Sequence, residues 1–310
     1  MNRLRIVFMG TPEFAVPSLD KLFKAGYDIA GVITAPDKPA GRGMKLTESA
    51  VKRYAVEKGL RILQPEKLKD PAFIEELKSL KADVQVVVAF RMLPEVVWNM
   101  PPLGTINLHA SLLPEYRGAA PINWAIINGE KETGVTTFKL QQEIDTGDIL
   151  LQQKIKIEDN DTAGTLHDKM MEVGADLLLR TIQQLEAGTL REMPQSSVFK
   201  IHHSTLHPAP KIFSENCKIN WDKTVDEIYN FIRGLSPYPA AFTYLKGKKL
   251  KIFSAEKELT KIVTKPGEVI TDNQTFLKFA ATDGFIHAKE VQLEGKKRMN
   301  IENFLRGWRE

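Results

Sequence analysis

The sequence of 310 residues predicts the α/β fold class, with a wound parallel sheet followed by a smaller C-terminal β-barrel domain. Through the first half of the chain, short apolar runs alternate with helical segments, which is typical of strands joined by crossover helices. In the last third, short alternating strands are separated by turns that contain glycine. The length suffices for two domains, which we place at residues 1–189 and 208–310 with a linker at 190–207.

The strands expected in the first domain differ in length and burial. The run at 4–9 is closed by Gly10, and the run at 84–90 is almost continuously apolar, as expected for a strand buried on both faces. The predicted strands are 4–9, 28–34, 61–63, 84–90 and 105–109, then 135–140 and 149–157 as closing strands that allow antiparallel pairing. The predicted helices begin at Pro17 and then cover 47–58, 71–80, 118–128 and 162–186.

The C-terminal domain is predicted from one helix and a series of turns. Periodicity is lost in the linker, whose His202 and His203 we interpret as surface residues, because no carboxylate or cysteine stands at ligand spacing. A helix is expected at 224–235, and alternating strands from 241 onward, with turns at Lys246-Gly247, Pro266-Gly267, Asp283-Gly284 and Gly295. This pattern indicates a small barrel, a fold that often binds nucleic acid.

Positive charge is concentrated in the last third of the chain. Residues 206–310 contain 18 Lys and Arg against 13 Asp and Glu, a net charge of +5, whereas the preceding part carries a net charge of −1. The asymmetry suggests a polyanionic partner bound through its phosphates. A solvated basic face accounts for the charge equally well.

Hydropathy and cysteine content indicate the cellular setting. The apolar run after the N-terminus is too short for a signal segment, and no stretch of about 18 apolar residues follows it. The single Cys217 excludes an internal disulfide and a cysteine-based metal cluster, and we interpret it as a packing residue. We therefore expect a cytoplasmic protein with no membrane partner, acting as a monomer.

The first strand–helix turn argues against a nucleotide cofactor. It reads GTPEF at 10–14, which lacks the glycine spacing of a dinucleotide site, and Pro12 removes an amide that would face a phosphate. No P-loop motif occurs elsewhere in the sequence.

Residues with catalytic potential follow the strand at 105–109. Its end lies at the carboxyl edge of the sheet, where ligands bind in wound α/β folds, and alternation places Asn107 and His109 on one face. An amide donor beside an imidazole can stabilise a developing oxyanion while the imidazole transfers protons. Asp145, in a later loop, would hold His109 as a donor if the fold brings them together. The three suit acyl transfer without a covalent nucleophile, although Asn and Asp also shape turns and a histidine at a strand end is often structural.

Several motifs together resemble one enzyme family. The pattern NxHxSLLPxYRG at 107–118, followed by DxG at 145–147, is similar to the transformylases that use 10-formyltetrahydrofolate. The resemblance is narrowed to the branch whose acceptor is methionyl-tRNA by RIVFMGTPEFAVP at 5–17, PAGRG at 39–43 and QLEGKKRM at 292–299. It spans nearly the whole chain.

This resemblance implies a Rossmann-like catalytic domain, an OB-like barrel that helps to hold tRNA, and formyl transfer from 10-formyltetrahydrofolate to initiator methionyl-tRNA without a metal. The implied catalytic residues are Asn107, His109 and Asp145, and the implied folate-binding segment is Ser111, Leu112, Leu113 and Pro114. The loop at 36–45 corresponds to the family's insertion near the acceptor stem, with Arg42 and Lys45 as candidate tRNA contacts. Arg91 stands where the family usually has glycine, so it either crowds the pterin pocket or points outward.

Two further groups of cations are candidate tRNA contacts because they lie at predicted hairpins. One group is Lys248 and Lys249, and the other is Lys296, Lys297 and Arg298. If both groups face one groove, each phosphate contact contributes to the salt dependence of binding. Solubilising turns would have the same composition.

Three other functions stay open on the sequence alone. A formyltransferase acting on an amino-sugar or glycinamide nucleotide would share the Asn107, His109 and Asp145 set but would not need a basic C-terminal domain. A 10-formyltetrahydrofolate hydrolase would use water as the acceptor and release formate. A non-catalytic RNA-binding protein would have no need of the catalytic set.

Overall fold

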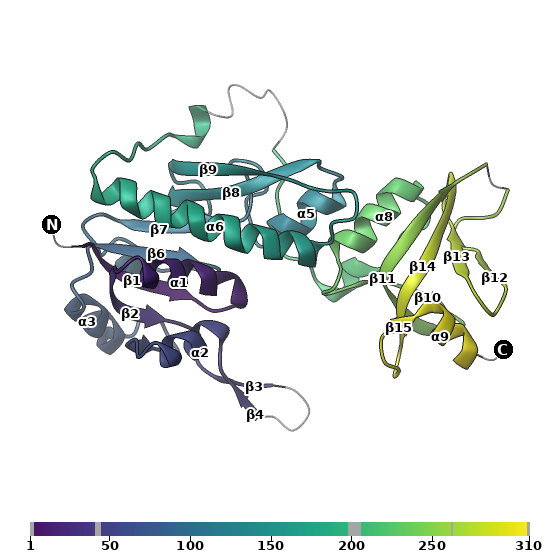
Figure 1. Ribbon diagram of the computed structural model, residues 1–310, viewed down its shortest axis with the longest axis horizontal. Helices are drawn as coiled ribbons and strands as arrows, with labels where there is room; N and C mark the ends of the chain where they lie inside the picture. The colour runs from purple at the N-terminus through teal and green to yellow at the C-terminus, as the bar shows by residue number, and fades with distance from the viewer. Residues whose placement is uncertain (1–2, 41–44, 198–205, 262, 309–310) are drawn as a thin grey trace. The chain divides into compact units, whose positions relative to one another are not determined.

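The computed structural model describes residues 3–40, 45–197, 206–261 and 263–308 (Figure 1). The chain divides into two compact units, each assembled from three segments. Unit 1 consists of Met1–Arg117, Gly134–Ile155 and Asp168–His207, and unit 2 of Gly118–Thr133, Lys156–His167 and Pro208–Glu310. The largest segment of unit 2 begins at Pro208, and the continuous domain boundaries given above stay a prediction.

Unit 1 is built on a seven-stranded sheet with the order β5-β2-β1-β6-β7-β8-β9. The strands are β1 (Arg5–Gly10), β2 (Asp28–Ile33), β5 (Ile62–Leu63), β6 (Val84–Val88), β7 (Thr105–His109), β8 (Glu132–Lys139) and β9 (Ile149–Lys156). The five strands from β5 to β7 pair in parallel, whereas β8 runs antiparallel to β7. The predicted wound parallel sheet is therefore confirmed, and every residue of β6 is buried, as its apolar run predicted.

Helices cover this sheet, and their starts follow from capping residues. The helices are α1 (Val16–Lys24) after the short η1 (Glu13–Ala15), α2 (Ala50–Glu57), α3 (Pro71–Ser79), α4 (Glu95–Trp98) and α6 (Ala163–Glu186). The side chains of Ser49 and Asp70 accept hydrogen bonds from the first turns of α2 and α3. Figure 1 shows α1 and α6 crossing the same face of the sheet, and Lys21 of α1 pairs with Asp176 of α6.

The loop predicted at 36–45 contains more regular structure than its turn-forming composition indicated. β3 (Lys38–Ala40) and β4 (Lys45–Thr47) pair in antiparallel fashion. The helix predicted from residue 47 begins at Ala50, because Thr47 pairs with Lys38 and the Ser49 side chain caps the first helical turn. Composition shows that a segment turns, but it does not show where a short strand ends.

Unit 2 contains a curled antiparallel sheet with the order β10-β11-β14-β13-β12, and β15 pairs with β14. The strands are β10 (Ala241–Leu245), β11 (Lys248–Leu259), β12 (Val269–Thr271), β13 (Leu277–Ala280), β14 (Gly284–Leu293) and β15 (Met299–Asn300). The helices of this unit are α5 (Pro121–Ile127), η2 (Ser214–Cys217), α8 (Val225–Gly234) and α9 (Ile301–Gly307). Where the structure describes the chain, no pairing joins β10 to β12, so the predicted barrel is an open, curled sheet.

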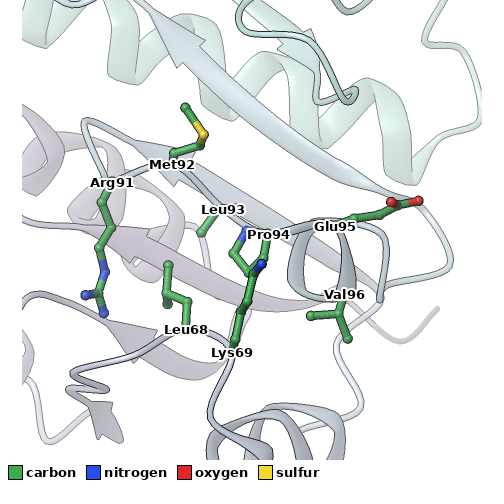
Figure 2. A pocket seen from close by; sticks show the side chains of 8 residues that line it. All are labelled: Leu68, Lys69, Arg91, Met92, Leu93, Pro94, Glu95 and Val96. Carbon is green, nitrogen blue, oxygen red and sulfur yellow. The ribbon is translucent and has the colours of Figure 1, made fainter.

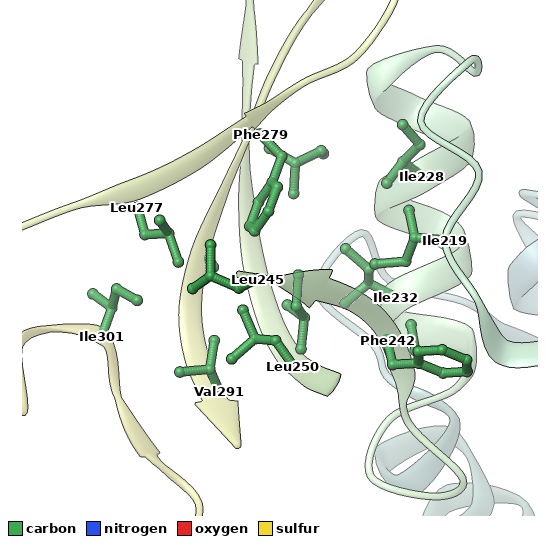
Figure 3. Packing of buried hydrophobic residues seen from close by; sticks show 14 of the residues in the cluster. Ile219, Ile228, Ile232, Phe242, Leu245, Leu250, Leu277, Phe279, Val291 and Ile301 are labelled. Carbon is green, nitrogen blue, oxygen red and sulfur yellow. The ribbon is translucent and has the colours of Figure 1, made fainter. Parts of the chain in front are cut away.

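The core of unit 2 lies between α8 and the sheet. Thr224 and Glu227 form a capping box that begins α8, and Ile228 and Ile232 on its inner side are buried. Figure 3 shows these residues with Leu250 and other strand residues in one cluster. Each buried Leu or Ile contributes about 1.5–3 kcal/mol relative to an exposed position, so this cluster fixes the sheet on the helix.

No helix within the described ranges is both long and apolar enough to cross a membrane.

Candidate active site

The carboxyl end of β7 presents two residues of the predicted catalytic set. β7 lies between the parallel β6 and the antiparallel β8. Because side chains alternate along a strand, Asn107 and His109 project from the same face, as the sequence spacing predicted. His109 is only 7% exposed, so protein groups rather than bulk water surround its ring.

Two oxygen atoms flank the His109 ring. Its Nε2 lies 2.9 Å from the carbonyl oxygen of Tyr116, and because a carbonyl only accepts, Nε2 carries a proton and donates it. Its Nδ1 lies 3.8 Å from Oδ2 of Asp145, which is beyond hydrogen-bond length but suits an ion pair when the ring is protonated. The fold therefore brings Asp145 beside His109 from a distant loop.

The loop that carries Asp145 is held in a tight shape. The φ angle of Asp145 is 55°, and Gly147 packs so closely on Lys139 that a Cβ would lie 1.7 Å from the Lys139 carbonyl oxygen. The buried Gln195 donates from Nε2 to the carbonyls of Asp145, at 2.9 Å, and Gly147, at 2.8 Å. One amide thus fixes the backbone on both sides of Thr146.

Arg117 orients this amide. Its Nε donates to Oε1 of Gln195 at 3.1 Å, and its Nη2 donates to the same oxygen. Because a guanidinium only donates, the oxygen of Gln195 faces Arg117 and its nitrogen faces the Asp145 loop. Sequence reasoning missed Gln195, which falls in the predicted linker; the only signal was Arg117, inside the NxHxSLLPxYRG motif.

The Tyr116 carbonyl that faces His109 is itself anchored. Tyr116 has a φ of 59°, its N–H donates to the carbonyl of His207 at 2.8 Å, and the two rings stack with centroids 5.7 Å apart. Glu115 accepts a hydrogen bond from the His207 N–H at 2.9 Å. His207 therefore fixes the backbone that positions the catalytic candidate His109.

The segment predicted to bind folate is folded into a turn against β8 and β9. Ser111 is fully buried and donates to the carbonyl of Glu115 at 2.6 Å, while the N–H of Leu113 donates to Thr136 Oγ1 at 3.1 Å. Leu113 packs in a small buried cluster, and the bond from Leu113 to Pro114 is cis. Leu112 lies against Gly134, where any Cβ would meet its side chain. These contacts show what shapes the segment, and its contact with folate stays a prediction.

A pocket of about 860 Å³ lies beyond the end of β6, the strand that pairs with β7 (Figure 2). Its lining consists of two residues from the segment before α3 and six consecutive residues after β6: Leu68, Lys69, Arg91, Met92, Leu93, Pro94, Glu95 and Val96. This volume is in the usual range for small-molecule sites.

The guanidinium of Arg91, which lines this pocket, is hydrogen-bonded to the backbone before α3. Its guanidinium donates to the carbonyl of Glu66 at 2.8 Å and to that of Pro65, and it lies over the Phe90 ring. Partial burial lowers the pKa of Arg91. Arg91 therefore lines the pocket with its guanidinium hydrogen-bonded to the backbone of residues 65–66.

The cations predicted to contact tRNA occupy different settings. Lys248 and Lys249 begin β11, and since they are adjacent in a strand they point to opposite faces. Arg298 pairs with Glu290 at 2.5 Å and lies over the Phe253 ring at 4.2 Å. Lys296 and Lys297 lie in the turn between β14 and β15, and Lys45 begins β4. Arg42, like His202 and His203, lies outside the described residues.

The remaining His, Cys, Asp and Glu residues form no candidate metal centre in the part of the chain that the structure describes. No group of three or more His, Cys, Asp or Glu residues in it could hold a metal ion. Cys217 is buried, its Sγ faces the carbonyl of Phe213 at 3.3 Å, and burial raises the pKa of its thiol, as expected for a packing residue.

Comparison with known proteins identifies the family of both halves of the chain. Residues 4–182 match the family model described as formyl transferase, and residues 211–309 match the model of the formyl transferase C-terminal domain. The methionyl-tRNA formyltransferase of Parabacteroides distasonis is 56% identical over 99% of this chain and 96% of its own length. That of Phocaeicola vulgatus is 58% identical over the same shares.

Solved structures share the fold. An N-formyltransferase from Helicobacter canadensis, crystallised with folinic acid and dTDP-3-aminofucose, matches with a TM-score of 0.69 over 92% of this chain and 98% of its own, at 23% identity. That likeness concerns the fold alone, whereas the relatives above are more than half identical over nearly their whole length. The resemblance predicted from the motifs is confirmed: the chain belongs to the formyl transferase family and carries both its N-terminal and its C-terminal domain.

Proposed function

We propose that this enzyme transfers the formyl group of 10-formyltetrahydrofolate to the free amino group of initiator methionyl-tRNA, which supports translation initiation. The observation that carries the proposal is the His109 ring, held between the Tyr116 carbonyl and Asp145 beside Asn107. A buried His109 beside a half-buried Asn107 suits acyl transfer that forms no bond to the protein. Relatives of 56–58% identity that are named methionyl-tRNA formyltransferase support the choice of acceptor.

The residues of the site have distinct tasks in this reaction. Model α-amino groups titrate near ~7.7–8.0, and the neighbouring ester lowers that value further, so the attacking amine is largely neutral at neutral pH. Asn107 and the Nδ1–H of a protonated His109, whose Nε2–H is held by the Tyr116 carbonyl, would stabilise the negative charge that develops on the formyl oxygen. Asp145 would hold His109 as a donor and orient a water that carries the proton of the amine to the departing nitrogen. The new C–N bond forms on the amino group as the bond to the donor nitrogen breaks.

The pocket beyond β6 is the candidate site for the formyl donor. Its apolar lining suits a flat ring system, and Lys69 and Arg91 suit the carboxylates at the other end of a folate. The chemistry that the donor supplies is a formyl group on nitrogen. The segment Ser111 to Pro114 follows β7 directly and would approach the same molecule from the next strand of the sheet.

The C-terminal unit is the candidate tRNA-binding part. It contains most of residues 206–310, which carry the net positive charge of the chain. The paired strands β3 and β4 would approach the acceptor stem, and Arg42, which follows β3 in the sequence, is a candidate contact there. The domain boundaries at 1–189 and 208–310, the monomeric state and the cytoplasmic location are further parts of this proposal.

The proposal is tested with purified protein, 10-formyltetrahydrofolate and either initiator or elongator methionyl-tRNA. Acid-stable formylmethionine on the initiator tRNA alone is the expected product. Product on neither tRNA, with folate binding intact, would redirect the search to sugar or glycinamide nucleotides as acceptors. Release of formate without an acceptor would indicate a hydrolase.

A further inference from the structure

One face of the sheet in unit 2 combines lysines with aromatic rings. In the pairing of β10 with β11, Tyr244 stands opposite Lys249 and Phe242 opposite Lys251, so all four side chains share a face. Lys218 forms an isolated bridge with Phe242 on the free side of β10. We name these five residues the basic-aromatic face. The intervening strand residues, such as Leu245 and Leu250, are buried in the core, and the Phe242 ring belongs to the same buried cluster.

Two lysines of this face lie over its rings, whereas Lys251 Nζ donates to the carbonyl of Pro239 at 3.2 Å. Lys249 Nζ lies 3.8 Å from the centroid of the buried Phe242 ring and covers it. Lys218 Nζ lies 5.8 Å from the centroid of the Tyr244 ring, which meets Phe242 edge-on at 5.8 Å. Cation–π contact therefore holds the ammonium groups close to the rings.

The lysines of this face lack the acidic partners that cations have elsewhere in the same sheet. Among the described residues, no carboxylate lies within 4 Å of the ammonium groups of Lys218, Lys249 or Lys251; Glu294 accepts only from the backbone N–H of Lys249. On the long strands β11 and β14 of this sheet, Lys257 pairs with Asp226 and Lys289 pairs with Glu256. The face therefore keeps its positive charge available to a ligand.

Tyr244 presents an exposed aromatic ring on this face. Its side chain is 52% exposed on the edge strand β10, so one large aromatic surface faces solvent beside these cations. A short distance before the face, Lys211 lies over the Phe213 ring, which is 50% exposed. Exposed rings with unneutralised cations fit a ligand that carries flat bases and phosphates together.

We propose that the basic-aromatic face binds an unpaired nucleotide of the RNA substrate, with a base stacked on Tyr244 and the flanking phosphates on Lys218 and Lys249. A base inside a duplex is covered on both sides by its neighbours, so only a single-stranded or looped-out nucleotide offers a free surface to Tyr244. This inference rests on the proposed tRNA acceptor and adds to it a defined subsite. The candidate Lys249 belongs to this subsite, and Lys248, on the opposite side of the sheet, does not.

The stacking step is tested with Tyr244→Leu and Tyr244→Phe in the full chain. Loss of one stacked base should raise the Kd for initiator tRNA about 5- to 140-fold, the equivalent of about 1–3 kcal/mol at 1.4 kcal/mol per tenfold. Tyr244→Phe keeps the ring and should bind as the unchanged protein does. A short single-stranded RNA should show the same dependence on residue 244, and a duplex of the same sequence should not.

The phosphate contacts are tested by a matched pair of double variants. Lys218→Gln with Lys249→Gln should reduce the slope of log K against log salt by about 0.7–0.9 for each phosphate that is no longer neutralised. Lys257→Gln with Lys289→Gln removes the same charge from ion-paired positions and should leave that slope unchanged. Equal effects of the two double variants would show that net charge alone acts, and would overturn the site.

The outcomes separate this inference from the proposed function. Formylation of methionyl-tRNA by the unchanged protein, together with an unaltered Kd in a folded Tyr244→Leu variant, would refute the subsite alone. Binding of single-stranded RNA that depends on Tyr244, without formylation, would refute the proposed acceptor alone. Binding of an acidic protein segment in preference to RNA would refute the choice of ligand.

Discussion

Two regions of this protein use polar side chains in opposite ways. Around His109 the groups are buried and bound to one another: the ring faces the Tyr116 carbonyl and Asp145, and Gln195 fixes the loop behind them. On the basic-aromatic face, Tyr244 is half-exposed and the adjacent lysines have no acidic partner in the described part of the chain.

The difference reflects what each region has to do. A developing charge is stabilised best by donors that are already fixed and shielded from water, since they need no rearrangement during the reaction. A long flexible polyanion is bound by exposed cations and rings, which gain their partners only when the ligand arrives. Changes in the first region should therefore act on kcat, and changes in the second on the Kd for tRNA.

The strongest test of this separation is Asn107→Ala. Loss of one donor to the formyl oxygen should lower kcat about 10²–10³-fold, while the Kd for tRNA stays unchanged. Single-turnover formylation at saturating tRNA measures the first quantity, and fluorescence anisotropy measures the second. The exposed Asn99 supplies the control, Asn99→Ala. A parallel loss of binding and turnover in Asn107→Ala would contradict the separation.

A smaller effect is expected from the residue that positions the Asp145 loop. Gln195→Glu keeps an oxygen for Arg117 but loses the amide that donates to the Asp145 and Gly147 carbonyls. A displaced carboxylate should lower kcat about 10- to 100-fold with little change in KM for either substrate.

A purely structural role of Gln195 would give a different result. It would lower the Tm and leave kcat of the folded fraction unchanged, whereas a positioning role also alters the pH profile of kcat through the Asp145–His109 pair. Gln153→Glu, on the exposed side of β9, is the matched control.

The sequence predicted the elements that depend on local pattern. The burial of residues 84–88 follows from their apolar run and is present, and the shared face of Asn107 and His109 follows from alternation along β7, which folds as predicted. The predicted start of α2 was wrong by three residues. Thr47 pairs with Lys38 in the β3–β4 ladder, and local sequence pattern does not reveal such pairing.

The rest of the site depends on contacts between distant segments. Asp145 was a candidate from its loop position and was carried over as catalytic through the resemblance, and only the folded chain shows its carboxylate 3.8 Å from His109. Gln195 lies 50 residues beyond Asp145 in a stretch without periodicity, so no local signal could connect the two. Likewise, the neighbours Lys248 and Lys249 were taken as one group, although strand alternation separates their faces.

The pocket beyond β6 is intermediate in character between these two regions, because it is open but lined mostly by apolar residues. Two of the Arg91 donors are occupied by the 65–66 carbonyls, and no other described residue accepts from its remaining N–H groups, which can therefore bind a carboxylate. Arg91→Ala should raise KM for 10-formyltetrahydrofolate about tenfold, as expected for one hydrogen bond to a charged group, with kcat unchanged. Steady-state kinetics with Arg61→Ala as the control would check this, and an unaltered KM would place the donor elsewhere.

The smallest effect is expected for Glu227 of unit 2. Its charge is paired with Lys223 within the protein, so it should affect stability and not RNA binding. Hydrogen bonds from Lys223 and then from Thr224 lower the pKa of Glu227 to about 2. Because the pKa in the folded protein lies below the ordinary value of 4.5, this carboxylate stabilises the fold above about pH 4.5 and loses its contribution as the pH falls toward 2.

Glu227→Gln keeps a capping acceptor but removes this charge. The variant should lose about 0.3–1 kcal/mol of stability at pH 7, the usual value for an exposed ion pair, and the difference should vanish near pH 2. Hydrogen exchange of the α8 amides in the full chain measures the loss, and Asp222→Asn, which removes a neighbouring charge outside the capping box, is the control. A changed Kd for tRNA in Glu227→Gln would show that internally paired charges also contribute to recognition, and the contrast with the basic-aromatic face would then fail.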